Sequence, residues 1–305
     1  RMSSVLLLSC PDQPGIVARM DQGGYYLPDA REGLRETIVT SAIDARPQPV
    51  ARVTGPAWCT IWAAVFTGGA FIFPTFSWYL PALLSGIAAV ACIVWWLWTS
   101  TALIPERPMK DVGLGLSLPT YVSGPSAPGW WGVFITMLGD MVAFASLIFG
   151  MFFYWTARPD FPPPLAEHAA GGWVVASALL YTASWAATRA ARPVQRRGRV
   201  PLAQVLLAAG ALTATAGAAA LVLSVSGLDP TSHVYPAMLY AVAVWTAAHT
   251  VAGVVMQLYC LAGTVWGKVL PEYDAPLWNT VLFWHFMLAT ALGSAAAIGL
   301  LPRLL

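Results

Sequence analysis

Three ionisable side chains lie inside long apolar stretches of this sequence and are the candidates for chemistry. Asp140 lies in GWWGVFITMLGDMVAFASLIFG, His249 in VWTAAHTVAG and His285 in WNTVLFWHFMLAT. An ionisable group within a membrane-spanning helix costs about 2.5 kcal/mol or more unless a partner satisfies it. We therefore expect Asp140 to form a hydrogen-bonded group with one of the histidines. Two roles are open for such a group: a proton- or lipid-associated role, or a purely structural one in which it holds the helices together.

Metal and haem sites are not expected from these residues. Only two histidines lie in the apolar blocks, and the rise per residue places them at depths that differ by about 10 Å, which does not suit a shared haem. The cysteines are scattered and show no CxxC or CxxH pairing, so neither a disulfide framework nor a zinc site is indicated; they are Cys10, Cys59, Cys92 and Cys260. We predict no catalytic, cofactor-binding or metal-binding residue in this chain.

The composition is that of a protein dissolved in lipid. Of 305 residues, 58% are hydrophobic and 10% are charged, whereas about a quarter of the residues in soluble domains are charged. Several apolar blocks exceed the roughly 20 residues that cross a hydrocarbon core about 30 Å thick. The formal net charge of +2 gives no basic field for nucleic acid, so that class of partner is excluded.

The apolar blocks predict an all-α membrane protein with about seven transmembrane helices. These lie near residues 56–76, 79–103, 130–156, 171–190, 202–227, 235–266 and 277–301. Only the stretch from Pro74 to Trp78 separates the first two, which form either a tight helical hairpin or one broken span. Gln257 and Asn279 are expected to hold helices together through hydrogen bonds.

These spans divide the chain into four predicted parts. They are an extramembrane N-terminal segment at 1–54, a two-helix transmembrane hairpin at 55–103, a linker at 104–128 and a five-helix bundle at 129–305. The linker is rich in Pro, Gly and Ser, which indicates a loop rather than a span.

The distribution of basic residues predicts the orientation. With seven spans, ten Lys and Arg residues fall on one side, and only Arg158 and Arg303 fall on the other. Because short cytoplasmic loops are enriched in Lys and Arg, the N-terminus is expected in the cytoplasm and the C-terminus outside. Tryptophans at helix ends, such as Trp130 and Trp266, are typical of membrane interfaces.

The block from 129 to 156 resembles the third helix of subunit III of haem-copper respiratory oxidases, such as cytochrome c oxidase. In that helix a Trp-Gly opening leads to an acidic residue and then to a Phe-rich stretch; Asp140 stands at the acidic position, where the family usually has Glu. His249 followed by Gly253 resembles the His and Gly pair of the family's penultimate helix. The resemblance extends over residues 129–305.

The last helix carries a third match, because Trp284, His285 and Phe286 resemble the family's Trp-His-Phe. Upstream, RETIVTSAIDARPQPV and PTYVSGPSAPGWW are similar to the junction in oxidases whose subunits I and III are fused. Two features depart from the family: Thr246 stands where a second histidine is frequent, and an acidic residue expected after the Trp-His-Phe is missing. Separately, VLLLSCPDQPGIVARM resembles the opening of the regulatory domain of formyltetrahydrofolate deformylases.

The resemblance implies a subunit without metals, in which two helices are separated from five by a cleft that holds lipid. It implies packing against subunit I and subunit II, with haem and copper held by those subunits. Such a subunit stabilises subunit I during turnover, supports proton uptake and guides oxygen, and is expected in the bacterial inner membrane. The alternatives are a secondary transporter that uses Asp140 and the histidines as an ion site, and a membrane scaffold.

Overall fold

The chain is mostly helical and divides into two compact units. The computed structural model describes residues 35–41, 43–53, 57–100, 108–112, 115–159, 169–300 and 302. The first unit ends at Tyr121 and the second begins at Val122. The stretch at 5–20 that resembles a regulatory domain lies outside the described residues, as does Cys10.

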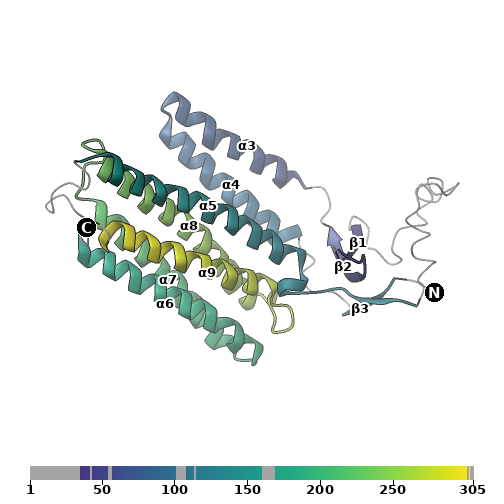
Figure 1. The fold of residues 1–305 in the computed structure, drawn as a ribbon. Coiled ribbons are helices and arrows are strands. Elements are labelled where there is room, and N and C mark those ends of the chain that lie inside the picture. Colours follow the sequence, from purple (N-terminus) through teal and green to yellow (C-terminus); the bar gives the residue numbers. More distant parts are fainter. Residues whose placement is uncertain are drawn as a thin grey trace. The chain divides into compact units, whose positions relative to one another are not determined.

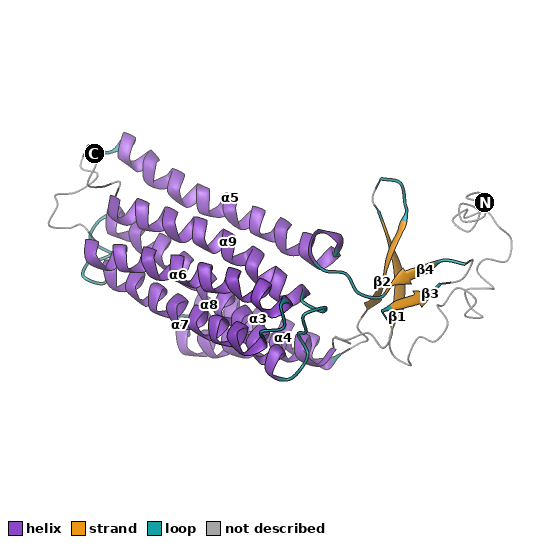
Figure 2. Ribbon diagram, turned by 90° about the horizontal axis from the view of Figure 1, so that it is seen from below, coloured by secondary structure: helices purple, strands orange, loops and turns teal. Residues whose placement is uncertain are grey.

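Two small hairpins form in the first unit, in the segments expected as an N-terminal tail and a linker (Figure 2). They are the antiparallel pair β1 (Arg35–Thr40) and β2 (Pro47–Val53), and the antiparallel pair β3 (Met109–Asp111) and β4 (Ser117–Pro119). Strand β2 contacts β4, Val50 and Leu118 are buried, and Lys110 forms an ion pair with Glu36. Segments about 70 residues apart in the sequence therefore pack together outside the apolar helices.

The first two apolar blocks form a helical hairpin. Helix α3 (Trp58–Ile72) is followed by the 3-10 turn η1 (Phe73–Phe76) and by α4 (Tyr79–Ser100). The chain reverses at Ser77, whose φ of 62° is left-handed, and the two helices pack side by side. Close approach requires Gly69, because a Cβ there would lie 2.9 Å from Oγ of Ser85. Most other side chains of this hairpin are exposed, as expected of helices that face lipid.

The second unit is a bundle of five long helices (Figure 1). They are α5 (Pro128–Ala157), α6 (Gly171–Arg196), α7 (Val200–Val225), α8 (Val234–Val265) and α9 (Ala275–Ala295). A short 3-10 turn, η2 (Gly124–Ser126), precedes α5, and a π-helical turn, η4 (Ala296–Leu300), continues α9. Helix α9 contacts α5, α6 and α8, while α7 packs between α6 and α8. This arrangement brings the helices that carry the three candidate residues into direct contact.

Helices α6 and α7 pack through a polar seam. The buried residues of α6 recur with alternating spacings of three and four; they are Val174, Ser177, Tyr181, Ser184, Thr188, Ala191 and Gln195. This spacing places them on one face of the helix. Ser177 donates a hydrogen bond to the carbonyl of Gly217 at 2.9 Å, and Ser184 donates to the carbonyl of Gly210 at 2.8 Å. Glycines on α7 allow this close approach.

Six of the long helices in the described residues are long and apolar enough to cross a membrane. They are α3 with η1, α4, α5, α7, α8, and α9 with η4. The exception is α6, which is 26 residues long. Its buried face carries hydroxyl groups and its last turns are basic, and both lower its mean hydropathy. The protein is therefore a helical, multi-pass membrane protein by length and composition.

Candidate functional site

Asp140 and His249 lie next to each other in the second unit. Oδ2 of Asp140, on α5, is 3.6 Å from Nε2 of His249, on α8. The side chain of Asp140 is 37% exposed and that of His249 is 22% exposed. The pair therefore lies at the surface of the bundle rather than in its core. Both residues are near the middle of their helices, because Asp140 is 12 residues from the start of α5 and His249 is 15 from the start of α8.

The imidazole of His249 makes three contacts with two neighbouring residues, Trp245 and Phe286. Its Nδ1 lies 2.8 Å from the carbonyl oxygen of Trp245. Because a carbonyl oxygen only accepts hydrogen bonds, Nδ1 carries the proton and Nε2 is the atom left to face Asp140. The ring stacks on Trp245 with 3.8 Å between centroids and meets the edge of Phe286 at 6.0 Å. These contacts fix the direction in which Nε2 points.

This geometry suits a site that holds one proton between two side chains. The contact is attractive if an imidazolium faces a carboxylate, and also if a neutral imidazole accepts from a carboxylic acid. At 3.6 Å the two atoms are about half an ångström beyond hydrogen-bond distance, which a small side-chain rotation can close. The pair is therefore a candidate proton site at the surface of the bundle.

His285 lies apart from this pair. It follows Trp284 and precedes Phe286 on α9, and consecutive residues of a helix point about 100° apart. Phe286 consequently reaches His249, whereas His285 is exposed and meets the ring of Trp185, on α6, at 5.9 Å. Its Nδ1 also contacts the carbonyl four residues earlier, that of Val281, at 2.7 Å. Of the two histidines, the structure places His249, and not His285, next to Asp140.

Gly253 and Trp284 form a close contact between α8 and α9. Trp284 is fully buried, and a Cβ added to Gly253 would lie 3.1 Å from Cζ2 of its indole ring and 3.1 Å from Cε1 of Phe283. A larger residue at 253 would push α9 away from α8. The contact therefore sets the helix spacing on which the position of Phe286 beside His249 depends.

A second polar cluster, which the sequence analysis did not single out, lies between the end of α6 and the start of α9. Nε of Arg192 is 2.8 Å from Oδ2 of Asp274, and its guanidinium lies 3.5 Å from the ring centroid of Trp278. Asp274 retains 4% of its side-chain exposure. The sequence offers only a partial signal for this cluster, because both residues are near helix ends, where charged side chains are common.

Hydroxyl and amide side chains also form pairs in the bundle interior. Tyr181 bonds Thr250 at 2.6 Å, and Thr246 bonds Ser294 at 2.7 Å. The amide nitrogen of Gln257 donates to Oγ1 of Thr188 at 2.7 Å. Gln257 therefore joins helices, as expected, and these bonds satisfy polar groups that lipid would not.

Within the described residues, no group of three or more His, Cys, Asp or Glu side chains is arranged to hold a metal ion. Cys260 is buried and bonds Thr280, whereas Cys59 and Cys92 are partly exposed.

Comparison with known proteins does not identify the chain: no protein-family model matches the sequence, and no curated protein matches it.

Proposed function

We propose that this chain is a non-catalytic subunit of a proton-pumping haem-copper terminal oxidase in aerobic respiration, similar to subunit III. In this proposal it lies in the bacterial inner membrane and packs against subunit I and subunit II, which hold the haem and copper. The complex reduces oxygen and translocates protons. The proposed chain stabilises subunit I, supports proton uptake and gives oxygen access through a lipid-filled cleft between a two-helix and a five-helix part.

One observation carries this proposal: the residues that resemble the family's three motifs meet in space. Asp140 on α5 faces His249 on α8, and His249 contacts Phe286 on α9. One helical turn further along α8, Gly253 packs against Trp284. The Asp140 motif lies more than 100 residues before the other two in the sequence, so the convergence supports a common origin for the resemblance rather than three unrelated matches.

The proposal needs α6 as a seventh span. Its polar residues support this, because Ser177, Ser184 and Thr188 are buried against α7 and α8 rather than exposed to lipid. Its helix of 26 residues is about 39 Å long, which exceeds the hydrocarbon thickness of about 30 Å. A seventh span puts the basic end of α6 and Lys268, which follows α8, on one side, which the positive-inside rule assigns to the cytoplasm.

The proposed role of Asp140 and His249 is to hold a proton near the surface that a partner subunit covers. A carboxylate that is 37% exposed at mid-helix is costly against lipid. Contact with a neighbouring subunit or with internal water would remove that cost. A one-proton pair there would buffer proton supply to the neighbouring subunit.

The first test is purification through a tag on this chain in a mild detergent, followed by reduced-minus-oxidised spectra and identification of the co-purifying proteins. Haem bands together with a subunit I homologue are the expected result. A colourless chain isolated alone from intact membranes would overturn the oxidase assignment and favour the transporter or scaffold alternative.

The second test addresses the pair within the purified complex. Asp140→Asn should leave haem content unchanged but slow proton uptake or shorten the active lifetime, because the variant loses the carboxylate that faces His249. Thr136→Val, one turn earlier on α5 and also exposed, is the matched control. If the Asp140 variant keeps wild-type turnover, proton uptake and lifetime, the pair has only a packing role.

A further inference from the structure

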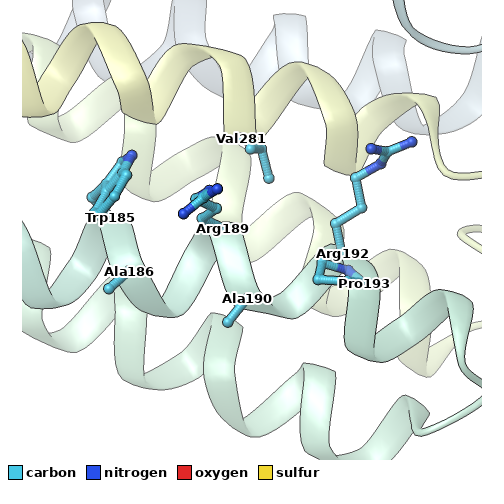
Figure 3. Close-up of a pocket in the computed structure, with 7 residues that line it drawn as sticks. All are labelled: Trp185, Ala186, Arg189, Ala190, Arg192, Pro193 and Val281. Carbon is cyan, nitrogen blue, oxygen red and sulfur yellow. The ribbon is translucent and has the colours of Figure 1, made fainter.

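A groove of about 440 Å³ lies between α6 and the start of α9. Its volume is in the range of small-molecule sites, about 300–1,000 Å³. The side chains of Trp185, Arg189 and Arg192 extend from α6 toward α9, where Val281 completes the lining (Figure 3). Alanine and proline residues of α6 contribute the rest of the wall. The groove therefore combines two cations with an apolar surface.

The two arginines differ in the side chains that surround their positive charges. Arg192 is paired with Asp274 and stacks on Trp278, so its charge is neutralised within the bundle. Arg189 is exposed, and its guanidinium lies 5.5 Å from the ring centroid of Trp185. Among the residues that the structure describes, no carboxylate forms an ion pair with Arg189. The groove thus presents one uncompensated positive charge, which favours an anion.

The charge lies where a lipid headgroup would be. Arg189 is seven residues, or about 10 Å, before Arg196, the last residue of α6. A long arginine side chain can extend from that depth to the headgroup region while its stem contacts apolar surface. Trp185 precedes it by one turn, and tryptophan is typical of the interface between headgroups and hydrocarbon.

The same pair of helices continues as an apolar surface away from the arginines. A second hollow of about 380 Å³ lies at the other ends of α6 and α9, and its lining has no charged residue. Val175 and Leu179, which line it, are 60% and 66% exposed. The arrangement of one cation at the end of an extended apolar surface matches an anionic head joined to acyl chains.

We propose that the groove at Trp185, Arg189 and Val281 binds a phospholipid with an anionic headgroup. The phosphate contacts the guanidinium of Arg189, and an acyl chain lies along α6 and α9 toward the membrane centre. This site is on the outer face of the α6–α9 pair within the second unit, and the inference does not rest on the proposed oxidase function.

Native mass spectrometry of the detergent-purified protein tests this site, with palmitoyl-oleoyl phosphatidylglycerol and phosphatidylcholine as probes. Wild-type protein should retain phosphatidylglycerol in preference to phosphatidylcholine. Arg189→Gln should weaken phosphatidylglycerol binding about tenfold, the effect of losing one charge-assisted hydrogen bond. Arg197→Gln removes the same charge at an exposed position just after α6 and should leave binding at the wild-type level.

A shape variant separates headgroup attraction from groove occupancy. Ala190→Leu keeps both arginines but adds bulk to the lining, so it should weaken phosphatidylglycerol binding several-fold. Equal binding by the Arg189 and Arg197 variants would overturn the site. Displacement of the lipid by inorganic phosphate would show that the groove is a site for a free anion. If wild-type protein showed no headgroup preference, a neighbouring protein would be the better candidate for the occupant of the groove. Each of these results refutes the proposal.

Discussion

The ion pair between Arg192 and Asp274 should stabilise the packing of α6 against α9 to a measurable extent. The two atoms are 2.8 Å apart, and the side chains retain 18% and 4% of their exposure. At an effective dielectric constant of about 20, two unit charges at that separation attract by about 6 kcal/mol. Most of that attraction offsets the cost of removing both charges from water. The net loss on breaking the pair therefore depends on what is left behind.

Arg192→Gln leaves the carboxylate of Asp274 buried without its partner, which should lower the free energy of unfolding by about 3–5 kcal/mol. Asp274→Asn should cost a similar amount, because it leaves the guanidinium partly buried over Trp278. The double variant leaves no unpaired charge and should regain about 2 kcal/mol or more relative to the sum of the single changes.

The assay is unfolding in mixed micelles with increasing dodecyl sulfate, followed by far-ultraviolet circular dichroism. Arg197→Gln is the control, since exposed substitutions usually change stability by less than about 0.5 kcal/mol. Additive losses in the double variant, or a loss below about 1 kcal/mol for Arg192→Gln, would refute the reasoning that this is a buried, coupled pair.

Two further predictions concern packing. Gly210→Ala would place a Cβ 2.9 Å from the amide nitrogen of Gln257 and should cost about 1–3 kcal/mol through overpacking. Gly139→Ala, whose Cβ would meet nothing within 4 Å, should leave the free energy of unfolding unchanged or raise it by up to about 1 kcal/mol. If the two alanine variants had equal stability in the same dodecyl sulfate titration, the close contact of α7 with its neighbours would be contradicted. In single-cysteine variants, the thiol of Cys260, 1% exposed, should react with maleimide only after unfolding, whereas the partly exposed Cys59 should react in the native protein. Rapid labelling of native Cys260 would show that α8 is not packed as described.

Helix positions were predictable because lipid imposes a simple requirement. Every backbone polar group in a membrane must be satisfied within its own segment, so long apolar stretches become helices whatever surrounds them. The predicted block at 130–156 corresponds to α5 at Pro128–Ala157, and that at 235–266 to α8 at Val234–Val265. The short strands were not predicted, since the pairing of β2 with β1 and its contact with β4 join segments that have no regular hydrophobic pattern.

The candidate site was predictable in its members but not in its partners. An isolated carboxylate or imidazole within an apolar helix is evident from sequence alone, which is how Asp140, His249 and His285 were selected. Which histidine faces Asp140 depends on the rotation of α8 and α9 about their axes, and side-chain packing sets that rotation. Phe286 turns toward His249, and His285 is therefore directed about 100° away, toward Trp185.

By itself, the sequence determined that this is a lipid-embedded helical protein, because hydrophobic length and the scarcity of charge are local properties. Tertiary structure alone decided that Asp140 lies next to His249 and that α6 buries its hydroxyl groups. It also decided that Arg192 pairs with Asp274, whereas Arg189 has no carboxylate partner among the described residues. Those outcomes depend on how neighbouring helices are rotated and spaced, and small residues such as Gly210 and Gly253 set that spacing through contacts distant in the sequence.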